Sequence, residues 1–483
     1  MKNFTSKLIL LLILSLNCSA ADNSPTLDPS GNWSGSLNVG AIKLRLALKI
    51  TRTNAGFVGT LDSIDQGANG IPISSVQFQK PAVVLEIKSI AARFDGVLAD
   101  DGLEMSGQWN QGGQLFPLVF KRVEKPLKLN RPQEPNMPYP YREELITFTN
   151  GKAGVKLAGT LTLPKEGNHF PAVVLITGSG AHDRNESLMG HRPFLILADF
   201  LTRHGIAVLR FDDRGVGGST GNKMTSTDED LSEDILAAVE WLKQRSDIDP
   251  KHIGLIGHSE GGIIAPLAAS RKPEIAFIVL MAGPGVPMNE LLQTQAAEIA
   301  RANGLNEEPV SLFRRFQSRA FDILKSQPDD QLAEKALREL WDEVIKNFTV
   351  EERKQIGLAD AGSTGQIKIM LTPWFRNMLA YEPKSTLVKV SCPVLALNGE
   401  KDLQVSSKDN LAGIAAALKA GGNHDFQTVE LQGLNHLFQT CKTGLPAEYG
   451  EIEETISSSA LKLMADWIRR RANLDKEHTV ITP

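Results

Sequence analysis

The chain has 483 residues, of which 42% are hydrophobic and 22% charged, with a formal net charge of -4 at pH 7. This length suffices for two or three domains, and the composition is that of an ordinary globular protein. Because the slightly acidic chain lacks the excess of positive charge that binds phosphate groups, we do not expect nucleic acid as a partner.

The N-terminus has the pattern of a secretory signal peptide over residues 1–20. A positively charged start precedes an apolar run of nine residues at 8–16, interrupted only by Ser15; this run is too short to span a bilayer, and small residues follow it. We expect cleavage after Ala20 or Ala21 and export to the periplasm or the exterior. In the alternative, Cys18 carries a lipid anchor, although an asparagine precedes it where lipoprotein signals place a small residue. No other stretch is long enough for a transmembrane helix, so we expect no transmembrane segment.

Residues 23–124 are predicted to form an all-β accessory domain. A first strand around Trp33 and seven further runs with alternating or apolar character give about eight strands. Eight antiparallel strands fit a barrel or a sandwich, and such a barrel can hold one small ligand. In the simpler interpretation, Trp33 and Trp109 only fill the core. The seven runs are 42–50, 56–62, 74–79, 83–88, 93–99, 103–109 and 115–122.

A proline-rich segment follows at 125–140. Its five prolines indicate a stiff, extended linker or a strap across a surface, and they mark a domain boundary.

From 141 to 483 the pattern becomes that of an α/β domain. Alternating strands and helices predict a doubly wound, mostly parallel sheet. The alternation stops at about 287–385, where the sequence is helix-rich and charged. An insertion there would lie over the carboxyl ends of the strands, so we interpret it as a helical cap, with an independent helical domain as the alternative. The predicted strands are 145–149, 155–163, 172–177, 207–211, 275–281, 393–397 and 427–431, and the clearest helices are 193–204 and 230–244.

Ser259 lies in the sequence Gly-His-Ser-Glu-Gly, between an apolar run and an alanine-rich helical segment. A bare match to this pattern is more often a plain loop, but here a strand precedes it and a helix follows. Glycines at 257 and 261 suit a sharp strand-to-helix turn, where a Cβ would collide with the backbone. The turn exposes the Ser259 hydroxyl at a helix N-terminus, whose free N–H groups favour negative charge. Ser259 is therefore the predicted nucleophile.

A serine nucleophile needs a base, and the base needs an anion that holds its tautomer. Asp402 stands in the loop after the predicted strand 393–397, and His436 in the loop after the last strand. We predict Asp402 as the acid and His436 as the base.

Both assignments have rivals. Glu400 and Asp409 lie near the predicted acid, where a plain acidic surface loop is also possible. His424 precedes the last strand and so belongs to the wrong sheet edge, and His258 is bound into the elbow beside the serine. No His, Cys or carboxylate cluster has metal-ligand spacing, so we expect no metal and no cofactor.

The tetrahedral intermediate needs two hydrogen-bond donors for its oxyanion. One is predicted to be the backbone N–H of Glu260, directly after the nucleophile. The other is expected in the small-residue turn after the strand at 173–177, with Ser179 as first choice and Gly180 as alternate. An ordinary glycine turn is the alternative for this segment.

Two charged residues near the predicted site have two interpretations each. Arg214 would either clamp a substrate carboxylate or form a structural ion pair with a neighbouring aspartate. The Glu260 side chain would either take part in the site or simply complement the helix dipole.

At these residues the chain resembles the α/β-hydrolase superfamily, and more narrowly secreted bacterial serine esterases related to serine aminopeptidases and dienelactone hydrolases. The order Ser259, Asp402, His436 is the order of that superfamily. The resemblance implies an α/β-hydrolase sheet over about 141–471 and hydrolysis of carboxylic esters through an acyl-enzyme on Ser259. It also implies that the cap shapes the acyl or alcohol pocket. The matching segments are ITGSGAHDRNE, LRFDDRGVGGSTG, GHSEGG, LALNGEKDLQV and GLNHLFQ.

The leading hypothesis is thus an exported serine esterase that acts on small-molecule esters with short to medium acyl or small aromatic groups. A serine peptidase of the aminopeptidase or prolyl-peptidase kind is the alternative. A third hypothesis is a binding protein whose β domain carries the function. The sequence leaves the oligomeric state and the ligand of the β domain open.

Overall fold

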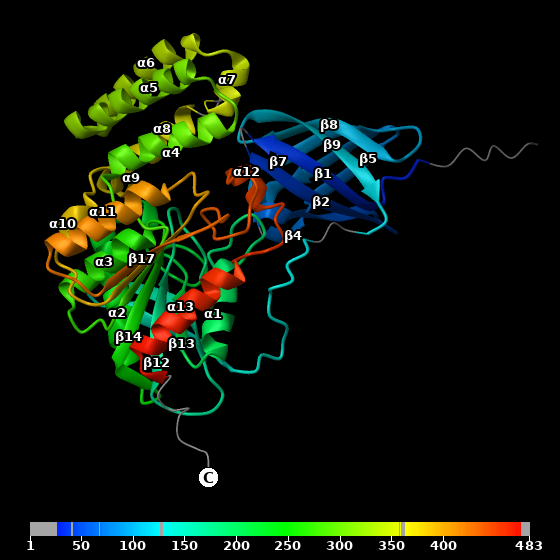
Figure 1. The fold of residues 1–483 in the computed structure, drawn as a ribbon. Helices are drawn as coiled ribbons and strands as arrows, with labels where there is room; N and C mark the ends of the chain where they lie inside the picture. Colours follow the sequence, from blue (N-terminus) through cyan, green and yellow to red (C-terminus); the bar gives the residue numbers. More distant parts are fainter. Residues whose placement is uncertain are drawn as a thin grey trace, which may run out of the picture.

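The computed structural model describes residues 27–39, 42–66, 68–125, 129–356, 358 and 363–474. The expected signal peptide at 1–20 lies outside the described residues. The described chain forms an antiparallel β-barrel, an α/β sheet flanked by helices, and a group of helices above the sheet (Figure 1). The fold class expected from the sequence is confirmed.

The N-terminal barrel closes through eight strands in the order β1-β9-β8-β7-β6-β5-β3-β2, and β4 pairs with β3 outside this ring. The eight ring strands are the eight predicted ones, whereas the short β4 was missed. The structure decides for a barrel over a sandwich because β2 pairs with both β1 and β3. The strands are β1 Gly31–Val39, β2 Ile42–Thr53, β3 Gly56–Ser63, β4 Ala68–Pro72, β5 Ser75–Gln79, β6 Ala82–Ile87, β7 Ala92–Leu98, β8 Glu104–Gln111 and β9 Gln114–Val123.

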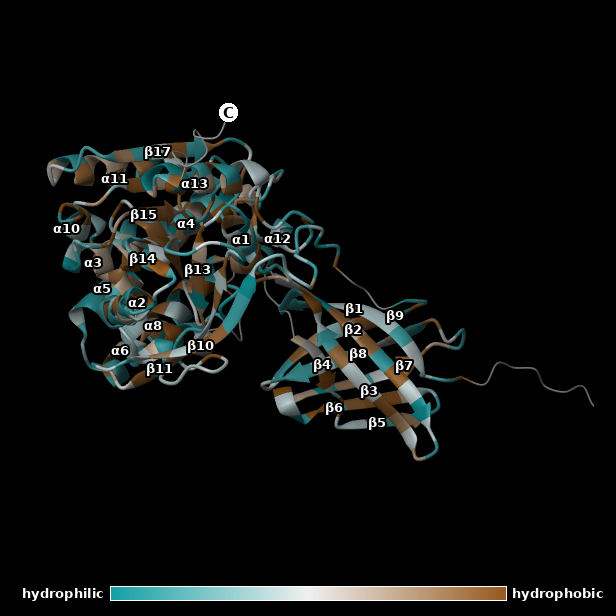
Figure 2. Cartoon of the chain, turned by 90° about the horizontal axis from the view of Figure 1, so that it is seen from below, coloured by the Kyte–Doolittle hydropathy of each residue, from teal (hydrophilic) through white to brown (hydrophobic). Residues whose placement is uncertain are grey.

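The barrel interior is packed with side chains. Trp33, Phe94, Trp109 and Phe120 are almost fully buried in one apolar cluster, and hydrophobic and polar residues alternate along the strands (Figure 2). The structure therefore agrees with the simpler interpretation that the two tryptophans fill the core.

The second sheet has the strand order β10-β11-β13-β12-β14-β15-β16-β17. The pairs from β13 to β17 are parallel, and β10 and β11 add an antiparallel hairpin at one edge. The strands are β10 Arg142–Asn150, β11 Val155–Leu163, β12 Phe170–Ile176, β13 Ala207–Phe211, β14 Ile248–His258, β15 Ile278–Met281, β16 Val394–Gly399 and β17 Phe426–Leu431.

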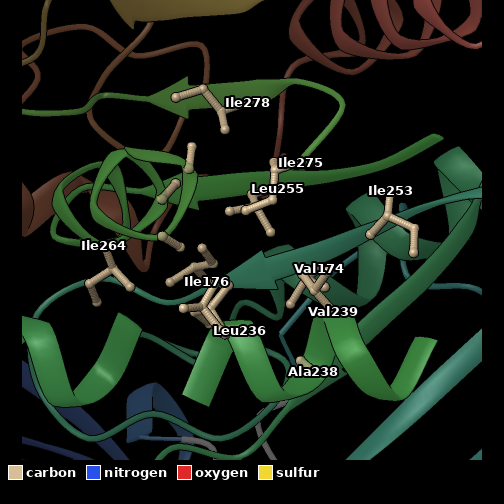
Figure 3. Close-up of a cluster of buried hydrophobic side chains, with 14 of the residues drawn as sticks. Val174, Ile176, Leu236, Ala238, Val239, Ile253, Leu255, Ile264, Ile275 and Ile278 are labelled. Atoms are coloured by element: carbon tan, nitrogen blue, oxygen red, sulfur yellow. The ribbon is translucent and has the colours of Figure 1, made fainter. Parts of the chain in front are cut away.

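Helices cover both faces of this sheet. Alternate residues of a buried strand point to opposite sides, so Val174 and Ile176 pack toward α2 and α3 (Figure 3), whereas Val173 and Leu175 pack toward α1 and α13. The flanking helices are α1 Pro193–Arg203, α2 Asp228–Lys243, α3 Gly261–Arg271, α10 Pro383–Leu387, α11 Ser407–Ala420 and α13 Ser458–Arg471.

The predicted insertion is a group of helices with an apolar core of its own, which includes Phe316, Phe321 and Trp341. These cap helices lie above the sheet (Figure 1). They are α4 Met288–Ala302, α5 Glu307–Ser326, α6 Asp330–Val344, α7 Val350–Gln355, α8 Ser363–Met370 and α9 Pro373–Leu379.

The barrel and the described part of the linker contact the α/β domain through hydrogen bonds. Arg45 of the barrel, which is paired with Asp65, donates to the carbonyl oxygen of Gly450 at 2.6 Å, beside α12 (Pro446–Tyr449). Arg131 of the linker donates to the same oxygen at 2.9 Å, and Gln133 donates to Ile456 O at 2.7 Å. The segment from residue 129 therefore lies as a strap on the domain that follows it.

Candidate active site

The turn that carries Ser259 is a strained strand-to-helix connection. Strand β14 ends at His258, Ser259 has a φ of 52°, and α3 begins at Gly261. A Cβ on Gly257 would lie 2.0 Å from the Gly261 carbonyl oxygen, and a Cβ on Gly261 would lie 2.4 Å from Ile176 O. Only glycine fits at either position, which explains the spacing seen in the sequence. The backbone strain at Ser259 is typical of functional sites.

Asp402 and His436 meet at the carboxyl end of the sheet. Asp402 follows β16 and His436 follows β17, and His436 Nδ1 lies 2.8 Å from Asp402 Oδ2. The other carboxylate oxygen, Oδ1, accepts hydrogen bonds from the backbone N–H groups of Gln404 at 2.8 Å and Val405 at 2.9 Å. The buried carboxylate is thus held in one orientation, and it can hold the imidazole with Nε2 unprotonated, as a general base requires.

Ser259 and His436 line one cavity of about 390 Å³ beneath the cap. Within the described chain, no hydrogen bond joins Ser259 Oγ to His436. Contacts between nucleophile and base are often long in unliganded sites and tighten when substrate binds. The structure therefore brings the two side chains into one chamber.

The rival residues lie elsewhere. Glu400 accepts a hydrogen bond from the Gly433 backbone at 2.8 Å, and Asp409 is a surface residue of α11 at 3.5 Å from Ser406 Oγ. His424 is exposed beyond the opposite end of β17. None of the three lines the cavity that contains Ser259.

The proposed oxyanion donors differ in position. Glu260 and Ser179 line the cavity, whereas Gly180, which has a φ of 96°, is not among its lining residues. Gly178 N–H donates to Glu186 Oε1 at 2.7 Å and is therefore occupied. Over residues 129–356, the hydrogen bonds include none donated by the backbone N–H of Glu260 or Ser179. These two groups are available for a developing negative charge.

A buried ion pair connects three parts of this site. Glu186 Oε1 lies 2.9 Å from His258 Nδ1, and His258 Nε2 lies 3.1 Å from the carbonyl oxygen of His436. Burial opposes the charged forms, but the imidazolium lowers the pKa of Glu186 and the carboxylate raises the pKa of His258. Because Glu186 also accepts a hydrogen bond from Gly178 N–H, this pair joins the turn that carries Ser259, the turn after β12 and the loop that carries His436.

A second buried network of hydrogen bonds and charged groups surrounds Lys223 and Glu260, next to Ser259 in the sequence. Lys223, in the short 3-10 helix Lys223–Thr225, is 1% exposed and donates to Gly178 O at 2.9 Å and to Asp213 Oδ2 at 3.0 Å. Its Nζ lies 3.7 Å from Glu260 Oε2. Glu260 Oε1 accepts a hydrogen bond from Trp374 Nε1 of α9 at 2.6 Å, which ties the cap to the residue after the nucleophile.

Two carboxyl groups in this network are close enough to perturb each other. Burial, and then the neighbouring Glu260 carboxylate, raise the pKa of Asp228 well above its usual range, and burial also raises the pKa of Glu260. Glu260 Oε2 and both oxygens of Asp228 are buried without a hydrogen-bond partner, which opposes the charged form of either group.

Arg214 belongs to a structural ion pair. Its Nε donates to Asp234 Oδ2 at 2.6 Å, and its Nη1 donates to Ser226 Oγ at 3.1 Å. The guanidinium is buried and does not line the cavity, so it cannot clamp a substrate carboxylate there.

Sequence reasoning missed Glu186, Lys223 and Trp374. Glu186 ends a matching segment but had no role assigned to it, and Lys223 and Trp374 lie outside the matching segments. Each of the three contacts partners that are distant in the sequence.

In the part of the chain that the structure describes, no group of three or more His, Cys, Asp or Glu side chains is arranged to hold a metal ion. No helix among these residues has both the length and the apolar character needed to cross a bilayer.

Comparison with known proteins adds a family. Residues 153–419, more than half of the chain, match the model described as X-Pro dipeptidyl-peptidase (S15 family). Esterase EstD of Thermotoga maritima is 25% identical over 359 residues, covering 73% of this chain and 74% of that protein. The uncharacterized protein YfhR of Salmonella typhimurium is 31% identical over 125 residues, covering 26% of this chain and 40% of that protein.

Two solved structures illustrate the range of similar folds. The esterase Pf2001 of Pyrococcus furiosus has 15% identity and a TM-score of 0.40, covering 68% of this chain and 93% of that one. The proline iminopeptidase of Mycobacterium smegmatis has 15% identity and a TM-score of 0.43, covering 69% of this chain and 100% of that one.

Proposed function

Since the chain belongs to the X-Pro dipeptidyl-peptidase (S15) family of hydrolases, we propose that it is a serine hydrolase that cleaves carboxylic esters. The substrates are small-molecule esters, and the acyl group is transferred to Ser259 and then to water. The observation that carries this proposal is the Asp402–His436 pair, at 2.8 Å, in the same chamber as Ser259 on its strained turn.

In the proposed first step, His436 Nε2 takes the proton of Ser259 Oγ while the oxygen attacks the ester carbonyl carbon. Asp402 holds Nδ1–H and stabilises the imidazolium that forms. The backbone N–H groups of Ser179 and Glu260 bind the oxyanion, and each is expected to contribute about 3 to 4 kcal/mol to transition-state stabilisation. The tetrahedral intermediate collapses, and His436 gives its proton to the alcohol as the ester C–O bond breaks.

In the second step, water replaces the alcohol. His436 takes one proton from a water molecule while the water oxygen attacks the carbonyl carbon of the acyl-enzyme. His436 then gives that proton to Ser259 Oγ as the bond between Oγ and the acyl carbon breaks and the acid leaves. The same oxyanion donors serve both steps, so both depend on the turn after β12.

The second candidate function is peptide hydrolysis. The family match over residues 153–419 favours it, because that family is described by X-Pro dipeptidyl-peptidase activity. The esterase relative, which is similar over 73% of the chain, favours ester hydrolysis. We place ester hydrolysis first because a small ester can be cleaved without a binding site for the N-terminus of a peptide.

The test compares kcat/KM for p-nitrophenyl acetate and butyrate with kcat/KM for aminoacyl and X-Pro naphthylamides. We expect the esters to be cleaved faster, and Ser259→Ala to lower kcat about 10⁶-fold. A fluorophosphonate probe should label the wild type and not Ser259→Ala. Faster cleavage of the amides would favour the peptidase, and failure of the probe to label Ser259 would remove the basis for a serine hydrolase.

We also propose that the protein is exported, on the basis of the charged start and apolar run at 1–20. Cell fractionation should find the mature chain in the periplasm or the medium, with an N-terminus at residue 21 or 22. Cys18→Ala should leave this distribution unchanged, and a shift from the membrane to the soluble fraction would instead indicate a lipid anchor at Cys18.

A further inference from the structure

The cap helices line a second, partly open cavity of about 470 Å³, which borders the cavity that contains Ser259. Helices α4 to α9 all contribute to its walls, and its lining includes the rings of Phe313, Phe316 and Trp341. None of the described residues that line it is charged, and its polar members are four glutamines. This volume lies in the range of small-molecule binding sites, which are mostly apolar.

The two cavities meet at one turn of α4. Leu292 and Gln295 lie three residues apart on one face of this helix, and both belong to the linings of both cavities. Helix α9 shows the same division, because Trp374 lines the cavity that contains Ser259 and its neighbour Phe375 lines the cap cavity. Gln295 Nε2 donates to Gln404 Oε1 at 3.2 Å, which anchors this turn to the loop that carries Asp402.

We propose that the cap cavity binds the distal part of a long acyl chain whose carbonyl carbon lies at Ser259. This inference rests on the proposed ester hydrolysis and names its substrate class: esters whose acyl chain outgrows the catalytic cavity of about 390 Å³. A hydrocarbon chain suits a space lined mainly by aliphatic and aromatic side chains, because the chain itself carries no polar group that would lose its hydrogen bonds to water.

The acyl chain suits this space better than the alcohol for a mechanistic reason. The acyl group stays bonded to Ser259 Oγ through both steps, so contacts with it act in acylation and in deacylation. The alcohol leaves after the first step, and a chain held in the cap would delay its release. Short acyl groups fit the catalytic cavity alone, so their esters remain substrates.

The magnitude follows from the burial of methylene groups. Each methylene that moves from water into the cap cavity contributes about 0.8 kcal/mol, which corresponds to a rise in kcat/KM of about fourfold. For p-nitrophenyl esters we expect kcat/KM to continue to rise from butyrate to decanoate. An ester series in which the alcohol is lengthened and the acyl group remains acetyl should show no such rise.

The decisive variant narrows the junction of the two cavities. Ala296 lies on α4 one turn after Leu292 and lines only the cap cavity, so Ala296→Phe fills part of the cap cavity beside the two residues that both cavities share. We expect it to lower the ratio of kcat/KM for decanoate to that for butyrate at least tenfold. Ala302→Phe, at the exposed end of the same helix, is the matched control and should leave the ratio as in the wild type.

Binding of free decanoate provides a readout that needs no catalysis. Full-length Ser259→Ala should bind decanoate at least tenfold more tightly than butyrate, with a change in the fluorescence of Trp341 or Trp374, and Ala296→Phe in the same background should remove the difference. Equal affinity for the two acids, or a decanoate-to-butyrate ratio unaffected by Ala296→Phe, would overturn the inference. A preference for long alcohols would overturn the assignment to the acyl chain. If no ester at all is cleaved, the proposed function fails, whereas tight decanoate binding still supports the cavity.

Discussion

The Glu186–His258 pair offers the sharpest test of how this site is built. Glu186→Gln keeps the shape of the side chain and an oxygen that can accept from the Gly178 N–H, which now lies 2.7 Å from Glu186 Oε1. It removes the charge that faces His258 Nδ1 at 2.9 Å. Breaking one side of a buried, hydrogen-bonded ion pair costs about 3 kcal/mol of unfolding free energy, because the remaining charge is left without a partner.

The loss should depend on pH in a defined way. The folded-state pKa of Glu186 is lowered from 4.5, so its contribution is present above about pH 4.5 and is lost as the pH falls through the folded pKa. The folded-state pKa of His258 is raised from 6.5, so its contribution is complete below 6.5 and is lost as the pH rises through the folded pKa. The difference between wild type and Glu186→Gln should therefore be greatest between pH 4.5 and 6.5.

The assay is urea unfolding at pH 5.5 and at pH 9, with kcat measured in parallel. Glu166→Gln, on the exposed loop between β11 and β12, is the control and should change the unfolding free energy by less than about 0.5 kcal/mol. We expect kcat to fall in Glu186→Gln, because His258, whose Nε2 contacts the carbonyl oxygen of His436, loses the charged partner that holds its ring. A destabilisation that is the same at both pH values, or no larger than that of the control, would refute the ion-pair interpretation.

Four further changes have defined outcomes. Asp402→Asn should lower kcat about 10⁴-fold with the fold retained, because the imidazole loses the partner that sets its tautomer, and single-turnover ester hydrolysis checks this. Gly257→Ala should lower the thermal midpoint by several degrees or prevent folding, because its Cβ would lie 2.0 Å from a backbone oxygen; an unchanged thermal midpoint would contradict the geometry. Trp374→Phe removes the indole N–H that donates to Glu260 Oε1 at 2.6 Å. We expect a lower kcat for esters, measured by activity, and little change in the unfolding free energy of the α/β domain, measured by circular dichroism. Asp228→Asn should stabilise the protein at pH 7 and not at pH 4. The pKa of Asp228 is raised in the folded state, so the wild type loses stability as the pH rises above 3.8, whereas an amide cannot ionise. Thermal midpoints at the two pH values measure the difference.

Local patterns were sufficient for most of the secondary structure. Alternation along the first 124 residues predicted the eight strands of the closed ring, because each half-buried strand repeats its apolar side chains every two residues. The missed β4, with the sequence ANGIP, is short and shows no alternation. Barrel and sandwich share these patterns, and the choice between them depends on which distant strands pair, such as β1 with β9.

The site shows the same division between local and distant information. The elbow could be located from the sequence because Gly257 is required by a contact with Gly261, four residues away, although Gly261 itself is required by the more distant Ile176. The positions of Asp402 and His436 followed from the order of strands, since the carboxyl ends of neighbouring parallel strands share one edge. By contrast, Lys223 and Glu186 look like ordinary charged loop residues in the sequence, although both are buried near the turn that carries Ser259.

The sequence by itself determined the turn that carries Ser259, the strands on either side of it and the chain order of the candidate catalytic residues, because short-range sterics and periodicity control these features. Only the tertiary structure decided that Trp374 of the cap bonds to Glu260, that Glu186 and His258 join three loops, and that a second cavity meets the first at Leu292. The Glu186–His258 and Trp374–Glu260 contacts join residues 72 or more positions apart, and their energy depends on burial that no local pattern records.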